Sequence, residues 1–154
     1  LGINIWAGYS ETQVDNNATS TATKDLDSDH EEGNIGAILT FGPVSAGYQR
    51  SAEFTGTETN GNTDYYAANA YGVSFNVSDN LSISWSGIES RRGKHGTNQG
   101  ATKTVDAEAT AIQLAYTMGG ASLKIAESEV TNASYGTGAS ADKDGTTIAL
   151  SLAF

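Results

Sequence analysis

The last nine residues of the chain, 146–154, place the tightest constraint on its fold. Large apolar side chains occupy every second position, Ile148, Leu150, Leu152 and Phe154, and only Thr, Ala and Ser stand between them. In an extended strand this period of two puts the large residues on one face and the small ones on the other. A strand at the surface of a soluble sandwich normally carries charged or long polar groups on its outer face. The pattern therefore predicts a strand with one face against lipid and the other towards a wide, wet space.

Seven further segments repeat this alternation along the chain. They cover residues 1–9, 35–41, 44–48, 71–77, 81–85, 112–118 and 121–125. Some connections are very short, such as Gly42-Pro43 and Gly119-Gly120, whereas others are polar and far longer than the usual 4–6 residues or so. Short turns at one end and long loops at the other are typical of outer-membrane barrels. We predict an all-β protein, an antiparallel transmembrane β-barrel with about eight strands in this chain, in which residues 1–154 form part of one barrel domain.

Aromatic residues fall near both ends of the predicted strands. Outer-membrane barrels carry such residues as two girdles at the lipid–water interfaces. The alternative is that they are ordinary strand aromatics packed in a soluble core. The predicted belt at the short turns is Phe41, Phe75, Tyr116 and Phe154, and the predicted belt at the opposite end is Tyr9, Tyr48, Tyr71 and Trp85.

The one charge well inside a predicted strand is Lys124, which is out of phase with Leu123 and Ile125. A Lys that faces lipid near the midplane costs about 2–4 kcal/mol, so Lys124 is expected to face the lumen. Asn69 shares the phase of Tyr71 and is expected at or above the interface. The residues predicted to line a pore are Lys124, Gln113, Gln49, Ser84 and Ser122.

Composition excludes several classes of protein. No segment approaches the roughly 20 consecutive apolar residues of a membrane helix. The chain has no Cys, which removes disulfides, thiol catalysis and Cys-based zinc sites. The net charge of −10 argues against a nucleic-acid partner, because phosphate neutralisation needs clustered Lys and Arg. The chain has no initiator Met or signal segment and opens at Leu1 inside a predicted strand, so we expect a fragment or a processed piece.

Several short segments resemble the C-terminal half of Gram-negative general porins, most like the alphaproteobacterial type. They are the turns at 42–44 and 116–121, the segment 72–77 and the stripe that ends at Phe154. The resemblance implies a homotrimer of roughly 16-stranded barrels in the outer membrane, in contact with lipid and lipopolysaccharide, that passes small hydrophilic solutes by passive diffusion. It also implies barrel-assembly machinery that reads the C-terminal strand through Ile148, Leu150, Leu152 and Phe154. The sequence departs from the family at Thr146, where an aromatic often stands, and it lacks the N-terminal half with the constriction loop.

Three alternatives stay open. The first is a complete eight-stranded barrel with a structural or adhesive role, the second is a barrel enzyme that uses His95 with Asp106, and the third is a soluble adhesive β-protein. A closed eight-stranded barrel is just narrow enough to be filled by side chains, whereas the residues predicted to point inward are too small to fill it. They are Gly36, Thr40, Ser45, Gly47, Ala68, Ala70, Gly72, Ser74, Ser82, Ser84, Ala115, Ser122, Ala126, Ala149 and Ser151. We therefore favour the wide channel and expect no enzymatic activity.

Candidate ligand-binding groups are few. Asp25, Asp27 and Asp29 begin a calcium-loop spacing, but His30 stands where the loop needs Gly and Gly36 where it needs Glu. We therefore predict no cofactor beyond divalent cations that bridge the acidic loops to lipopolysaccharide phosphates. His30 and His95 are both predicted in loops, as is the basic cluster 91–95, whose charges suit anionic headgroups or solutes.

Overall fold

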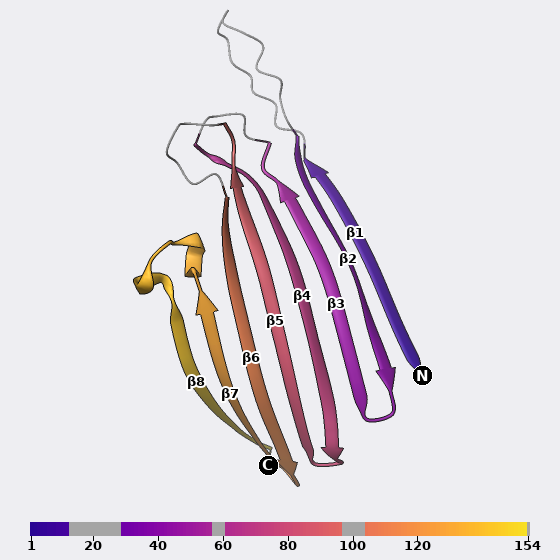
Figure 1. The fold of residues 1–154 in the computed structure, drawn as a ribbon. Helices are drawn as coiled ribbons and strands as arrows, with labels where there is room; N and C mark the ends of the chain where they lie inside the picture. The colour runs from indigo at the N-terminus through magenta and orange to yellow at the C-terminus, as the bar shows by residue number, and fades with distance from the viewer. Residues whose placement is uncertain (13–28, 57–60, 97–103, 154) are drawn as a thin grey trace, which may run out of the picture.

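The computed structural model describes residues 1–12, 29–56, 61–96 and 104–153. They form one antiparallel sheet of eight strands in the order β1-β2-β3-β4-β5-β6-β7-β8, so each strand lies beside its neighbours in sequence (Figure 1). This confirms the predicted all-β, antiparallel architecture. The strands are β1 (Gly2–Thr12), β2 (His30–Phe41), β3 (Val44–Phe54), β4 (Thr63–Ser78), β5 (Leu81–Lys94), β6 (Thr104–Met118), β7 (Ala121–Thr131) and β8 (Lys143–Leu152).

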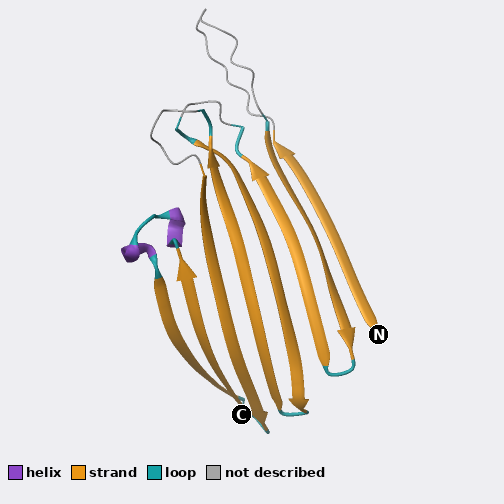
Figure 2. Ribbon diagram, viewed as in Figure 1, coloured by secondary structure: helices purple, strands orange, loops and turns teal. Residues whose placement is uncertain are grey.

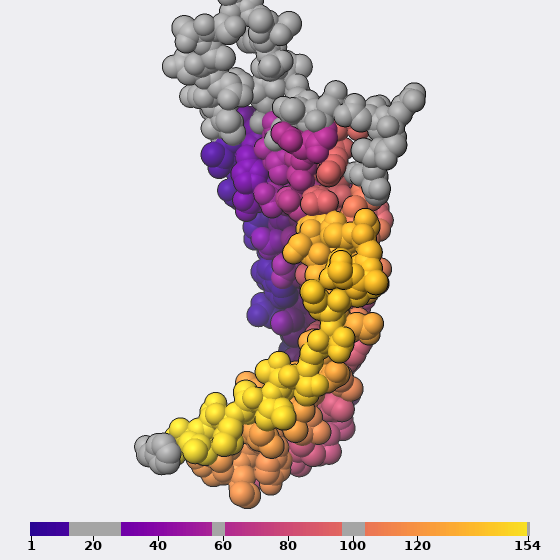
Figure 3. All heavy atoms as spheres, turned by 90° about the vertical axis from the view of Figure 1, so that its left-hand side faces the viewer, coloured from indigo at the N-terminus to yellow at the C-terminus, as the bar shows by residue number. Residues whose placement is uncertain are grey.

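The sheet is open in the part of the chain that the structure describes. β1 pairs with β2 and β8 pairs with β7, and each has no second neighbour among these strands. Seen from the β8 side, the layer is bent into a crescent (Figure 3). The closed barrel therefore stays a prediction, and so does placement in a membrane.

The connections sort by length onto the two ends of the sheet. Two-residue turns, Gly42-Pro43, Asp79-Asn80 and Gly119-Gly120, join β2 to β3, β4 to β5 and β6 to β7. The strand ends that flank the four longer connections lie at the opposite end, which we call the loop end (Figure 2). Gly42 and Gly119 have φ angles of +56° and +58°, a backbone region that favours glycine.

The connection between β7 and β8, which the structure describes in full, contains two short 3₁₀ helices, η1 (Ala133–Tyr135) and η2 (Ala139–Ala141). Within the described ranges, no helix has the length and apolar character needed to cross a bilayer. Phe154 lies outside the described residues, as do Asp25 and Asp27 of the predicted calcium-loop spacing.

The strands run further towards the loop end than the apolar alternation predicts. β2 already begins at His30, so the prediction that His30 lies in a loop was wrong. The prediction of a loop from residue 91 was wrong as well, because β5 continues to Lys94 and Arg91 pairs with Asp106. Backbone pairing depends on N–H and C=O groups and not on apolar side chains. Polar residues can therefore extend a strand that the apolar alternation does not reveal.

The register collects the large apolar residues on one face, because directly opposed residues of neighbouring strands share a face. One row of opposed residues runs through Leu39, Ala46, Val73, Trp85 and Ile112. We call this side of the sheet the apolar face. At its C-terminal edge, Ile125 opposes Ile148, and Leu123 opposes Leu150.

No second layer covers the apolar face in the described part of the chain. Val105, at 9% exposure, is the one buried hydrophobic residue among the described ones. Ile5 is 69% exposed, Ile148 70% and Leu150 64%. A soluble sheet buries such residues against a partner layer. This sheet carries a row of large apolar residues like that of a protein core, but no partner layer in the described chain buries it.

Candidate functional site

The candidate site is the other side of the sheet, which we call the small-residue face. A typical row runs through Ser45, Ser74, Ser84, Gln113 and Ala126, each opposite the next. Three hollows open on this side, and the residues predicted to point inward all lie on it.

The five residues predicted to line a pore come from four strands and lie together on this face. Lys124 opposes Ala115 on β6 and Ala149 on β8, so its ammonium group has small neighbours on both sides. The others are Gln49 on β3, Ser84 on β5, Gln113 on β6 and Ser122 on β7. The register confirms their common phase, and a pore-lining role stays a prediction.

An apolar cluster on the small-residue face was not predicted from the sequence. Trp6 lies over Gly36, and a Cβ added at Gly36 would overlap the indole ring. Trp6, Ile38 and Ile88 line a hollow of about 430 Å³ together with small residues such as Gly72. Trp6 and Ile38 are out of phase with the stripes of their strands, a signal that was available in the sequence.

The β7–β8 connection folds over the loop end of the small-residue face. The hydroxyl of Tyr135 lies 2.6 Å from Ser90 Oγ, and its ring lies 5.5 Å from that of Tyr66. Arg92 stacks 5.1 Å from the centre of the same ring and donates a hydrogen bond to the Tyr135 carbonyl at 3.3 Å. Because Tyr66, Ser90 and Arg92 project from the small-residue face, η1 narrows the space above it.

The apolar face changes character towards the loop end. Tyr48 donates a hydrogen bond to Asn69 Oδ1 at 2.8 Å, and Arg50 donates to the same oxygen at 3.1 Å. Asn69 opposes Arg50 and Glu89, two residues beyond Tyr71. A polar row thus begins directly beyond these tyrosines, and the position of Asn69 at or above a membrane interface stays a prediction.

Beyond this row, Arg91 and Asp106 form a two-pronged ion pair on the apolar side. Arg91 Nε and Nη2 donate to the two carboxylate oxygens at 2.6 Å and 2.9 Å. Hydrogen bonding from Arg91 holds the pKa of the Asp106 carboxyl below its ordinary value. This ion pair disfavours the alternative in which Asp106 acts with His95 as a catalytic pair, because both carboxylate oxygens already accept hydrogen bonds from Arg91.

Lys124 is not the one charge well inside a strand, so that prediction was wrong. Glu127 lies within β7 on the apolar face, opposite Ile112 and Thr146. The hydroxyl of Thr146 donates to Glu127 Oε2 at 2.5 Å. Thr146, where the resemblance calls for an aromatic residue, thus partners a carboxylate, and the apolar band is shorter along β7 and β8 than along β4.

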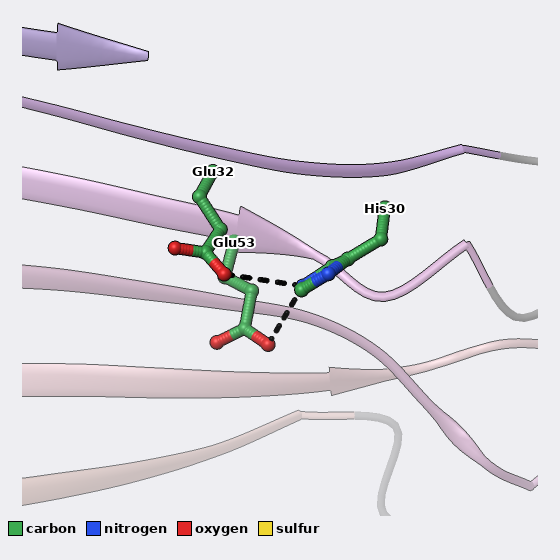
Figure 4. A group of neighbouring side chains, drawn as sticks. All are labelled: His30, Glu32 and Glu53. Carbon is green, nitrogen blue, oxygen red and sulfur yellow. Dashed lines mark hydrogen bonds and ion pairs between the residues drawn. The ribbon is translucent and has the colours of Figure 1, made fainter. Parts of the chain in front are cut away.

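One cluster of possible metal ligands lies at the loop end of the small-residue face. His30 Nε2 is 3.6 Å from Glu32 Oε1 and 3.1 Å from Glu53 Oε1 (Figure 4). No motif predicted this cluster, because His30 and Glu53 are 23 residues apart and only the β2–β3 register brings them together.

The C-terminal strand β8 carries the alternating apolar residues on its uncovered face. Ile148, Leu150 and Leu152 are 70%, 64% and 54% exposed on the apolar face. Assignment of a function depends on this geometry, because comparisons of the chain with family models, with curated proteins and with solved structures gave no match.

Proposed function

We propose that this sheet is part of the wall of a transmembrane β-barrel, a general diffusion porin of a Gram-negative outer membrane. The apolar face lies against lipid, and the small-residue face lines a water-filled channel for small hydrophilic solutes. The observation that carries the proposal is the uncovered apolar face, with exposures of 60% at Ile3, 57% at Ile35 and 64% at Leu150. Contiguous apolar patches on soluble monomers rarely exceed a few hundred Å².

Strand lengths fit a bilayer. The strands have 10–16 residues, and a tilted transmembrane strand needs about 9–11. Eight strands at roughly 4.8 Å spacing make a band roughly 35 Å wide, which is too broad to be a chance patch. Tyr48 and Tyr71 oppose each other where the polar row begins, the position of an interfacial aromatic belt.

The small-residue face suits a hydrated wall. Its hydroxyl groups bond to each other, as in the Thr40–Ser45 contact of 3.1 Å, and hydroxyl groups also bond well to water. Small side chains leave room for solutes, and Lys124, Gln49 and Gln113 supply sparse polar groups that give the channel a weak preference. In this proposal water fills the space above the small residues, so they do not need a partner layer.

The open edges favour a large barrel over a closed eight-stranded one. In lipid, each unpaired backbone group costs several kcal/mol, so β1 and β8 must pair with further strands in the whole protein. We propose a barrel of roughly 16 strands, assembled as a homotrimer in contact with lipopolysaccharide through machinery that reads Ile148, Leu150 and Leu152. Catalysis has no place in this proposal.

A soluble adhesive sheet is the competing function, and permeability separates the two. The whole protein, purified in detergent and reconstituted into liposomes, is expected to admit small sugars at rates that fall with sugar size. Liposomes without protein, and liposomes with heat-unfolded protein, serve as controls. Folded protein that inserts but leaves the liposomes impermeable would refute the channel, and protein that stays in solution without detergent would favour the adhesive sheet.

A further inference from the structure

The side chains of His30, Glu32 and Glu53 converge on one point at the loop end of the small-residue face. Their ligand atoms all lie within 4.8 Å of one another (Figure 4). His30 and Glu32 are alternate residues of β2, and Glu53 is directly opposite Glu32 on β3. Paired backbones fix the starting positions of all three side chains, so the convergence does not depend on a loop.

The register places two carboxylates directly opposite each other. Like charges at directly opposed positions of a sheet destabilise it, so a positive group between Glu32 and Glu53 would remove a cost built into the ladder. The imidazole of His30 approaches both carboxylates through the same atom, Nε2. A metal ion coordinated by that nitrogen and by both carboxylates relieves the repulsion and uses each donor once.

The donor spacing and chemistry fit a borderline transition metal. Zinc binds His nitrogen and carboxylate oxygen at about 2.0–2.2 Å, which separates neighbouring tetrahedral ligands by roughly 3.3–3.5 Å. The two observed separations of 3.6 Å and 3.1 Å bracket this value. The side chain of Glu32 is 57% exposed, so it has room to bring its carboxylate to ligand distance from that of Glu53. Calcium prefers six to eight oxygen ligands, so an imidazole at the centre disfavours it.

Solvent reaches the cluster through a hollow of about 440 Å³ that Glu32 and Glu53 help to line. Gly8, Ser10 and Asn34 border the same hollow, which leaves room for a water ligand. A three-ligand site with an open position is a common zinc arrangement. This site needs no assumption about lipid or a channel.

We propose that His30, Glu32 and Glu53 form a binding site for one divalent transition-metal ion of the zinc class. The bound ion ties β2 to β3 at the loop end and offsets the charge of the two carboxylates. At the mouth of a channel, that change would alter the local field met by charged solutes.

Zinc binding to the purified, folded whole protein tests the site by titration calorimetry. We expect one ion per chain, with no competition from calcium. His30→Ala and Glu53→Gln are each expected to weaken binding by more than the roughly 10–100-fold that loss of an outer-shell partner costs. Glu31→Gln is the matched control: it removes the same charge from the next position on β2, on the opposite face, and should leave binding unchanged.

Copper provides an independent readout of the ligand set. The electron paramagnetic resonance spectrum of bound Cu²⁺ should show coupling to one imidazole nitrogen. His30→Ala should abolish this coupling, and His95→Ala should retain it. Circular dichroism establishes that each variant is folded. Stoichiometric binding that survives both His30→Ala and Glu53→Gln would overturn the site, as would folded wild-type protein that binds calcium in preference to zinc or binds neither.

Discussion

The two faces of β5 differ more than the two faces of an ordinary sheet strand. Ile83 and Trp85 are 39% and 44% exposed on one side, while Ser82, Ser84 and Ser86 occupy the other. Apart from the β7–β8 connection at Ser90 and Arg92, neither side is covered in the described chain, so the contrast is not one between core and surface. It is a contrast between two surroundings, one that accepts large apolar side chains and one that accepts small polar groups.

Each face of the sheet also contains residues that do not fit its general character. Trp6, Ile38 and Ile88 gather on the small-residue face, and Glu127 lies on the apolar face. The cluster around Trp6 packs over glycine, whereas Glu127 takes a hydrogen bond from Thr146. Along β7 and β8 the lipid-facing band of our proposal is therefore narrower than along β4.

Placing the same charge on neighbouring residues of β6 gives the largest expected effect. Leu114→Arg puts a guanidinium on the apolar face between Ile83 and Ile125 and should cost about 2–4 kcal/mol in a bilayer. Gln113→Arg puts the same group on the small-residue face and should cost less than about 1 kcal/mol. Urea unfolding of protein in lipid vesicles measures both costs, and equal costs would show that the two faces of β6 meet the same surroundings.

Adding a methyl group beneath Trp6 gives the second-largest expected effect on stability. Gly36→Ala overlaps the indole and should destabilise the protein by about 1–3 kcal/mol through overpacking. Gly33→Ala is the control, because a Cβ there meets Gly8 O at an ordinary 3.7 Å on the apolar face. The same unfolding assay applies; if Gly36→Ala proves as mild as Gly33→Ala, Trp6 does not pack against β2 as described.

Loss of the Arg91–Asp106 pair gives the smallest effect, because the two side chains are 56% and 49% exposed and salt screens them. The pKa of Asp106 is lowered from 3.8 in the folded state. The ion pair therefore stabilises the folded state at pH values above the ordinary pKa of the carboxyl group. This contribution disappears as the pH falls through the lowered pKa of the folded state. Arg91→Gln should be slightly less stable than wild type at neutral pH, and the gap should close in acid. A gap that grows in acid would contradict this sign.

Periodicity alone predicted the strands and the face on which each residue lies. It placed Lys124, Gln49 and Gln113 on one side because a period of two is fixed by strand geometry. It missed the strand ends at His30, Phe54 and Lys94, since polar residues pair as well as apolar ones.

The cluster of His30, Glu32 and Glu53 could not be predicted from one sequence. Its members come from two strands, and their opposition depends on the register set by the Gly42-Pro43 turn. A one-residue change in that register would move Glu53 to the other face. Trp6 and Ile38, in contrast, could have been found from their phase.

In our proposal the large residues meet lipid and the small ones meet water. The chain has no Cys, so single cysteines from position 82 to position 86 can carry a fluorescent label in reconstituted protein. We predict that a lipid-soluble quencher acts at Ile83 and Trp85, and a water-soluble quencher at Ser82, Ser84 and Ser86. Labels at Ile83 and Trp85 that neither quencher reaches, or the reversed alternation, would contradict the placement of the apolar face against lipid.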